Sequence, residues 1–260
     1  MGLEPAQLAA VRIMSASLFL FAVGGRQLKS IRPAQWPYVA LSAFLGTFFP
    51  AFLFAWAETG IDSGLTSMLN ALTPLQTLWT GAVFFGFAMQ RKQGLGLLLG
   101  MAGTALLVYR PEHSLGAQGW MYPMAVLLAT LFYGMNINVI KRHLSDCAPL
   151  ALGVGNFAVM ILPAVLMLWL SPGHVQWQAP ATQTAVAYVA LLGVLGTGTA
   201  NLLYFRLIQQ TSPMYAAWVT YLIPLVALAW GLSDGEPLYP LQGLGALFVL
   251  GGIAWSQRSR

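Results

Sequence analysis

Long apolar runs separated by short polar gaps make up most of the chain. There are nine, at residues 5–24, 36–57, 64–87, 94–109, 119–140, 149–170, 184–205, 213–231 and 240–256. A helix needs about 20 apolar residues to cross a hydrocarbon core about 30 Å thick. Runs of this length lack the alternating pattern of barrel strands, and a helix satisfies every backbone group inside lipid. The pattern predicts an all-α, polytopic membrane helical bundle with nine spans.

The composition leads to the same class of protein. Charged residues make up 7% of the chain and hydrophobic residues 58%, and the mean hydropathy is +0.70. Soluble domains carry about 25% charged residues, so lipid must cover much of this surface. The basic residues stand singly or in small groups between the runs, which argues against a nucleic-acid surface. The single cysteine, Cys147, excludes an internal disulfide framework.

The charges in the gaps predict how the chain is oriented in the membrane. With nine spans, one side carries ten of the twelve basic residues: Arg26, Lys29, Arg32, Arg91, Lys92, Lys141, Arg142, Arg206, Arg258 and Arg260. The other side carries Arg110 and the acidic residues Glu4, Glu58, Asp62, Glu112, Asp234 and Glu236. Cytoplasmic loops are enriched in Lys and Arg. We therefore expect a multi-pass protein of the cell inner (plasma) membrane with a cytoplasmic C-terminus.

Two parts of the chain repeat each other. YVALSAFLGT at 38–47 and YVALLGVLGT at 188–197 are identical at seven of ten positions. At the same offset LTPL at 72–75 aligns with LIPL at 222–225, and QGLG recurs at 93–96 and 242–245. Upstream, Pro5 aligns with Pro149. The alignment predicts a first repeat at 1–110 and a second at 111–260.

The two predicted repeats differ in their number of spans. The second has five and the first has four, because no run precedes Pro5 to match 119–140. Repeats with an odd number of spans cross the membrane in opposite senses, and inverted repeats are typical of secondary transporters. We therefore expect two inverted five-helix repeats with the first helix of repeat one missing.

Several motifs carry a resemblance to a known family. They are PAQLAAVR at 5–12, LNALTP at 69–74, YGMNINVIKR at 133–142 and GEPLYPLQGLG at 235–245. With two five-helix repeats of this length, the chain resembles the EamA-type family of the drug/metabolite transporter superfamily. It departs from that family at Phe87, the repeat partner of Glu236, where the family often has Glu. The resemblance implies export or exchange of small metabolites, amino acids or drugs across the cytoplasmic membrane.

A polar stripe on the run at 64–87 is the first candidate for a substrate site. Its members are spaced three or four residues apart, which places them on one helix face: Ser63, Thr66, Asn70, Thr73, Thr77 and Thr80. Pro74 interrupts this helix and frees a backbone carbonyl, and its match to Pro224 points to a binding site. Ser and Thr also join helices in lipid, so a dry helix–helix seam is the alternative to a water-accessible cavity.

Other polar and aromatic residues lie inside the remaining runs. Aromatic rings and amides suit a cavity for amphipathic or cationic molecules, although aromatic residues also form interfacial belts or pack. Arg12 is the one strong base inside a run. A charge there should face protein or water, or snorkel to the outer interface. The predicted substrate-binding residues are Asn70, Thr73, Tyr133, Asn136, Asn201, Tyr204, Trp218, Tyr221 and Arg12.

No catalytic, metal or cofactor motif accompanies these residues. The sequence has no HExxH, GxSxG or GK[ST] motif, and His113, His143 and His174 lack metal-ligand spacing. We expect a secondary transporter that works by alternating access without a cofactor. The alternatives are a truncated, non-transporting membrane subunit and a membrane-embedded enzyme. The expected partners are a small-molecule substrate and the lipid bilayer, with a homo-oligomer as an option and no nucleic acid.

Overall fold

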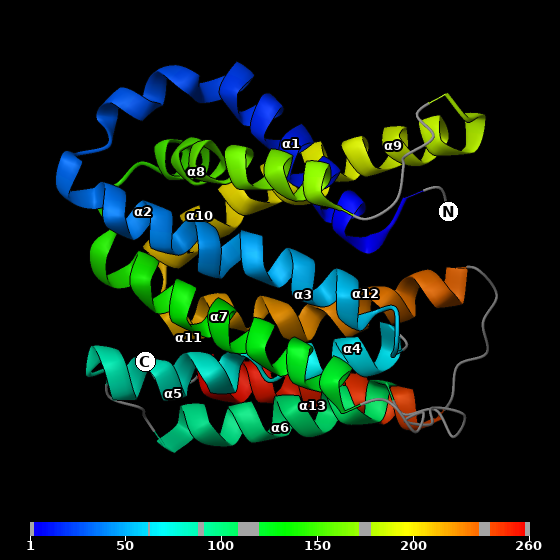
Figure 1. The fold of residues 1–260 in the computed structure, drawn as a ribbon. Helices are drawn as coiled ribbons and strands as arrows, with labels where there is room; N and C mark the ends of the chain where they lie inside the picture. The colour runs from blue at the N-terminus through cyan, green and yellow to red at the C-terminus, as the bar shows by residue number, and fades with distance from the viewer. Residues whose placement is uncertain are drawn as a thin grey trace. The chain divides into compact units, whose positions relative to one another are not determined.

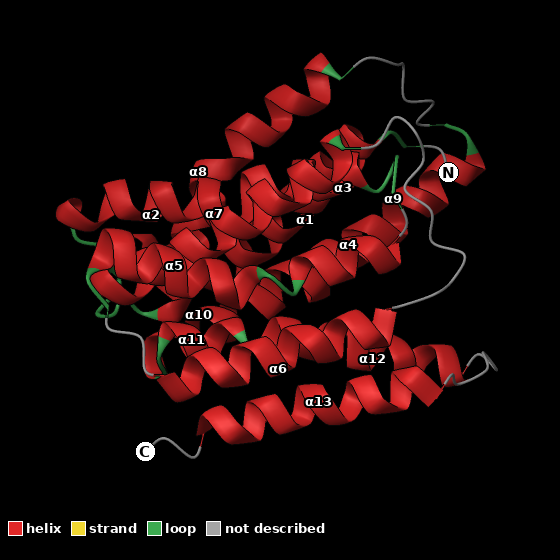
Figure 2. Ribbon diagram, turned by 90° about the horizontal axis from the view of Figure 1, so that it is seen from below, coloured by secondary structure: helices red, strands yellow, loops and turns green. Residues whose placement is uncertain are grey.

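The computed structural model describes residues 3–61, 63–87, 91–108, 120–171, 178–233 and 240–257. Every regular element within these ranges is helical (Figures 1 and 2). The elements up to residue 108 are α1 (Pro5–Gly24), η1 (Gly25–Ser30), η2 (Pro33–Gln35), α2 (Trp36–Ala43), η3 (Phe44–Phe48), α3 (Phe49–Ala57), α4 (Ser63–Asn70), α5 (Thr73–Phe85) and α6 (Arg91–Val108). Those that follow are α7 (Met121–His143), α8 (Pro149–Leu170), α9 (Pro180–Leu192), η4 (Gly193–Thr199), α10 (Ala200–Gln210), α11 (Pro213–Ala217), α12 (Val219–Ser233) and α13 (Pro240–Gln257).

The helices lie where the apolar runs predict them, and α1 and α8 begin and end at the predicted residues. By length and composition, five helical segments among the described residues could cross a membrane: Pro5–Ser30, Pro33–Ala57, Met121–His143, Pro149–Leu170 and Pro180–Gln210. Some charges used to predict the orientation lie outside the described residues: Asp62, Arg110, Glu112, Asp234, Glu236, Arg258 and Arg260. His113 and His174 also lie outside them.

Proline marks the start of many of these helices. It is the first residue of α1, α8, α9, α11 and α13. Because proline lacks an N–H and its φ is fixed near the helical value, the first helical position tolerates it best. At the start of α1, the Gln7 side chain also accepts a hydrogen bond from the Glu4 backbone N–H at 3.0 Å. The local sequence therefore determines where these helices begin.

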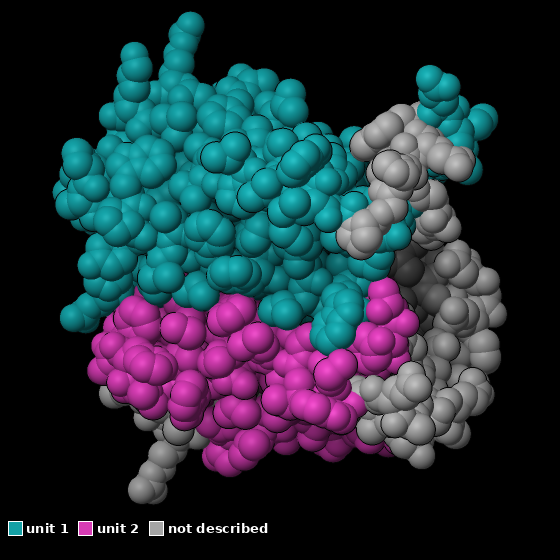
Figure 3. Space-filling view, viewed as in Figure 1, with its two compact units in different colours: residues 1–56, 139–212 teal, residues 57–138, 213–260 magenta. Residues whose placement is uncertain are grey.

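The chain forms two compact units, which Figure 3 shows in different colours. Unit 1 contains residues 1–56 and 139–212, and unit 2 contains residues 57–138 and 213–260. Each unit combines helices from both halves of the sequence, so the units differ from the sequence repeats. The boundary at residues 138 and 139 falls inside the continuous helix α7.

Unit 1 is built on the packing of α1 against α8 (Figure 1). Its core contains Ile13 and Leu20 of α1 and Val154 and Phe157 of α8, all of which are fully buried. The buried Ser17 hydroxyl donates to the Ile13 carbonyl oxygen at 2.8 Å, so its polar group is satisfied within the helix. Helices α9 and η4 pack on the same helix α1.

Unit 2 is built on the packing of α6 against α13, which lie side by side in Figures 1 and 2. Glycines make this contact close. A Cβ atom on Gly252 would lie 2.6 Å from the Gly96 carbonyl oxygen, and one on Gly103 would lie 2.6 Å from the Val249 nitrogen. Small residues allow helix backbones to approach in this way. The two QGLG segments of the sequence therefore belong to a single helix pair.

Candidate functional site

The predicted substrate-binding residues are divided between the two units. Unit 2 contains Asn70, Thr73, Tyr133, Asn136, Trp218 and Tyr221, and unit 1 contains Arg12, Asn201 and Tyr204. We describe each group within its own unit.

The polar stripe in unit 2 is broken between α4 and α5, near the predicted position. Pro74 lies in the first turn of α5. Because proline has no N–H, the carbonyl four residues earlier, that of Asn70, loses its helical partner. The Thr73 hydroxyl replaces that partner and donates to the Asn70 carbonyl oxygen at 2.7 Å. Thr73 is buried and Asn70 is half-buried. The Thr73 hydroxyl therefore stabilises the helix break, which leaves the Asn70 side chain partly exposed.

The second half of the stripe forms a buried seam with α7. Asn138 is fully buried, and its Nδ2 atom donates to the Thr77 carbonyl oxygen at 2.8 Å and to the Thr80 hydroxyl at 2.9 Å. The same atom donates to the Gly134 carbonyl oxygen at 3.0 Å. A Cβ atom on Gly134 would lie 2.7 Å from the Thr77 nitrogen, so the two backbones touch. For Thr77 and Thr80, the seam interpretation is therefore the one that the contacts support.

Asn138 is a residue that the sequence interpretation missed. It stands two positions after Asn136 in YGMNINVIKR, and side chains two apart on a helix do not share a face. The sequence feature that could have identified Asn138 is Gly134, four residues earlier. At that spacing, an amide and a small residue lie on the same helix face and can contact one neighbouring helix. Asn136 is buried too, and the Oδ1 atoms of Asn136 and Asn138 both lack a hydrogen-bond partner within the described part of the chain.

The aromatic pair of unit 2 lies in an apolar cluster. Trp218 and Tyr221 pack with Ala71, Met214 and Val249, next to the break after Asn70. The Tyr221 ring lies over α6, where a Cβ atom on Gly100 would be 2.4 Å from it. The Trp218 Nε1 atom is buried and, among the described residues, lacks a hydrogen-bond partner. The Tyr221 ring therefore packs on α6, and the Asn136 Oδ1 and Trp218 Nε1 atoms lack a partner among the described residues.

Within unit 1, the two candidates on α10 are both half-buried: Asn201 and Tyr204. Helix α10 packs on α8 and on η4. Arg12 is half-buried in α1, and its Nε atom is buried without a hydrogen-bond partner among the residues that the structure describes. The α1 backbone beside it contacts η4, because a Cβ atom on Gly193 would lie 2.6 Å from the Arg12 carbonyl oxygen.

Unit 1 also contains two π-helical segments, η3 and η4. Both contain the sequence Leu-Gly-Thr, at 45–47 in η3 and 195–197 in η4. These are the segments that the repeat alignment matches. Short π-helical stretches within α-helices are rare and are frequent at functional sites. The wider turn at the same repeat position is therefore a shared feature that the sequence alignment alone did not reveal.

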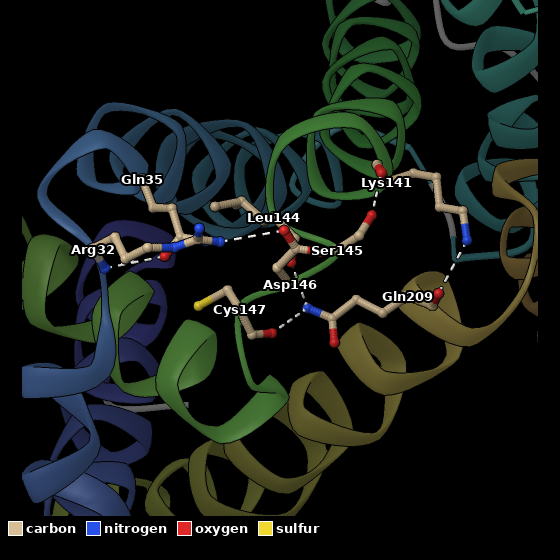
Figure 4. Close-up of polar contacts among 8 residues, drawn as sticks. All are labelled: Arg32, Gln35, Lys141, Leu144, Ser145, Asp146, Cys147 and Gln209. Atoms are coloured by element: carbon tan, nitrogen blue, oxygen red, sulfur yellow. Dashed lines mark hydrogen bonds and ion pairs between the residues drawn. The ribbon is translucent and has the colours of Figure 1, made fainter.

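A polar cluster joins the ends of α7 and α10 in unit 1 (Figure 4). The Gln209 Nε2 atom donates to the carbonyl oxygens of Leu144 and Cys147, at 2.8 and 2.7 Å. Lys141 Nζ donates to the Gln209 carbonyl oxygen at 3.0 Å. These bonds add partners to carbonyl groups at helix ends and in the α7–α8 loop, where the Leu144 carbonyl oxygen also accepts from the Cys147 backbone N–H at 3.1 Å. They give the loop a fixed conformation.

The same figure shows how the loop meets Arg32, the residue before η2. Arg32 forms an ion pair with Asp146 at 3.2 Å, and both side chains are exposed, so the pair contributes about 0.2–1 kcal/mol. Burial raises the pKa of the Cys147 thiol above its ordinary value, although the positive charge of Arg32 acts in the opposite direction. Since the thiolate is the reactive form, Cys147 is a weak nucleophile near neutral pH.

Together, the long apolar helices and the polar atoms buried between them define a polytopic helical membrane protein. A family model described as the EamA-like transporter family matches residues 2–109 and 120–257. The chain belongs to the EamA-like transporter family, whose members are transporters and not enzymes. It is a multi-pass inner membrane transporter.

Relatives of known description agree with this family. The chain is 26% identical over 265 residues to a probable terminal-alkyne amino-acid exporter of Streptantibioticus cattleyicolor, covering 99% of this chain and 86% of the relative. It is 27% identical over 212 residues to a probable amino-acid metabolite efflux pump of Salmonella typhimurium, covering 78% of this chain and 70% of the relative. It is 25% identical over 251 residues to the uncharacterized inner membrane transporter YedA of Escherichia coli K12, covering 92% of this chain and 77% of the relative.

A solved crystal structure has the same fold. It superposes with a TM-score of 0.80 at 18% sequence identity, covering 98% of this chain and 88% of the other.

Proposed function

We propose that this protein is a secondary transporter that moves small metabolites, amino acids or drugs across the cytoplasmic membrane by alternating access. The observation that carries the proposal is the π-helical turn at the equivalent position of both sequence repeats, in η3 and η4. Matched irregular helices in the two halves are a property of transporters that expose one site to each side in turn.

The proposed architecture has nine spans in two inverted repeats, at 1–110 and 111–260, with the C-terminus in the cytoplasm. The family model supports the division, because its two matched ranges fall on either side of residue 110. The packing supports it as well, since the repeat-equivalent helices α1 and α8 pack together, and so do α6 and α13. Repeats related by a two-fold axis bring equivalent helices together near that axis.

The proposed substrate contacts are the residues predicted from the sequence, taken within each unit: Asn70, Thr73, Tyr133, Asn136, Trp218 and Tyr221 in unit 2, and Arg12, Asn201 and Tyr204 in unit 1. Asn136 and Trp218 are compatible with this, because each has a buried polar atom without a partner among the described residues, as Asn138 and Asn156 also have, and a polar substrate or water would satisfy such an atom. The half-buried Asn70 and Asn201 lie at irregular or polar helix faces, and the Asn70 Oδ1 atom accepts a hydrogen bond from the Thr73 hydroxyl at 3.3 Å. The names of two relatives, an amino-acid exporter and an amino-acid metabolite efflux pump, favour amino acids among the proposed substrates.

A transport assay on the full chain in proteoliposomes tests the proposal. We expect counterflow of at least one compound from a panel of labelled amino acids, organic acids and organic cations. Asn70→Ala should lower its rate about 3- to 10-fold, because about one hydrogen bond to the substrate is lost. Thr184→Ala, on an exposed position of α9, is the control and should leave the rate unchanged. Counterflow no greater than in empty liposomes for every compound would refute the transport function.

A further inference from the structure

The net positive charge of the chain belongs to unit 1. Unit 1 contains seven Lys and Arg residues and two acidic residues, Glu4 and Asp146, whereas unit 2 contains five of each kind. In the proposed orientation, Asp146 is the one acidic residue on the cytoplasmic side, because the other six belong to gaps on the opposite side. The Asp146 carboxylate lies 3.2 Å from Arg32. The basic residues of η1, Arg26 and Lys29, therefore remain to attract an anion from outside the protein.

Arg26 and Lys29 lie on one exposed face of η1. Side chains three residues apart on a 3-10 helix eclipse each other, and the two residues are about 6 Å apart along its axis. Another side of the same segment faces α8. Leu28 packs against the core of unit 1, and a Cβ atom on Gly24 would lie 2.8 Å from Leu150 Cδ1. This packing holds the two cations outward, at a spacing that suits one phosphate group.

An exposed apolar surface leads along α1 to these two cations. Leu18 is 65% exposed, Val23 is 57% exposed, and Ala22 is exposed as well. Leu18, Ala22 and Arg26 are spaced four residues apart, as on one helix face, and Leu18 lies about 12 Å before Arg26. The segment Pro5–Ser30 is long and apolar enough to cross a membrane. An apolar surface that ends in cations matches an acyl chain with its phosphate, whereas a soluble anion would contact the cations alone.

We propose that this face of α1 and η1 binds an anionic phospholipid. Its phosphate lies between Arg26 and Lys29, and an acyl chain lies along Leu18 and Ala22. Arg presents a planar fork that suits phosphate oxygens, and Lys adds a point charge. Basic residues at the level of the head groups attract anionic lipids in this way. The lipid belongs to the leaflet at this end of unit 1, which is the cytoplasmic leaflet in the proposed orientation.

Melting temperatures of the full chain in neutral detergent micelles test this proposal. Phosphatidylglycerol should raise the melting temperature of the wild type, because a ligand that binds only the folded state stabilises it. Zwitterionic phosphatidylcholine should raise it less. The double variant Arg26→Gln/Lys29→Gln should bind phosphatidylglycerol about 30-fold more weakly, which corresponds to about 1 kcal/mol for each basic residue. Lys29→Gln alone should bind it about 5-fold more weakly, so the site stays testable if the double variant does not fold.

A charge-matched control separates a defined site from general attraction to a basic surface. Arg142→Gln/Arg206→Gln removes the same charge from two other exposed positions of unit 1 and should keep the wild-type response. Equal losses in the two double variants would overturn the proposal, and so would a wild type that phosphatidylglycerol does not stabilise. Glycerol 3-phosphate carries the phosphate without acyl chains. An equal rise with this compound would assign Arg26 and Lys29 to a soluble phosphate instead of a lipid.

Discussion

Gly252→Ala should markedly destabilise the α6–α13 helix pair. A Cβ atom at position 252 would lie 2.6 Å from the Gly96 carbonyl oxygen and 2.9 Å from the Gly100 nitrogen. Both are backbone atoms, so they cannot move away by changing rotamer. Overpacking of this kind costs about 1–3 kcal/mol, and separating the helices would add lost contacts. We expect a clearly lower melting temperature for the purified protein.

The neighbouring residue provides a matched control for this variant. Gly251 lies on the same helix, is exposed, and has no atom within 4 Å of its Cβ position. Gly251→Ala should be neutral or stabilising by about 0.5–1 kcal/mol, because alanine favours helix more than glycine does. Equal melting temperatures for the two variants would show that the close α6–α13 contact does not hold in the folded protein.

Asn138→Ala should have the second large effect on stability. It removes the contacts through which the two N–H groups of one fully buried amide are shared among acceptors on Thr77, Thr80 and Gly134. Hydrogen bonds between membrane helices average about 0.6 kcal/mol each, and the buried Thr77 and Thr80 groups would lose this partner. We expect a loss of about 2 kcal/mol, measured as a lower melting temperature or less folded protein after extraction.

Asn136→Ala is the matched control, two residues earlier in α7. Asn136 is also buried, and the Oδ1 atoms of Asn136 and Asn138 both lack a partner among the described residues, but only the Asn138 amide is seen to donate hydrogen bonds there. Its removal should leave the melting temperature nearly unchanged and lower the transport rate, since we propose that it contacts the substrate. The opposite result, a stable Asn138→Ala and an unstable Asn136→Ala, would exchange the roles assigned to the two amides.

The sequence predicts the helices of this protein well because their causes are local. Apolar length determines where α1 and α8 lie, and proline at the first position fixes where they begin. The break near Pro74 follows from the missing N–H of proline. The family resemblance, drawn from short motifs and the repeat, was confirmed by the family model over both matched ranges.

Other features depend on packing that no local pattern contains. The choice between Asn136 and Asn138 depends on which face of α7 meets α5, and both residues look alike in the sequence. The π-helical turns at η3 and η4 differ from α-helix by one step in hydrogen-bond register, which hydrophobic spacing does not record. The spacing of the polar stripe at 63–80 predicts a single helix face with one role. Thr77 and Thr80 instead form a seam, and Thr73 supports the break.

Access to position 70 from both sides of the membrane tests the account most directly. Asn70→Cys in a Cys147→Ser background is treated with a small, membrane-impermeant thiol reagent, in intact cells and in inside-out vesicles. Cys147→Ser alone gives the background labelling. Alternating access through a site that contains Asn70 predicts labelling in both preparations and slower labelling when a transported compound is present. A folded, transporting variant that is labelled from neither side, or from one side only, would contradict it.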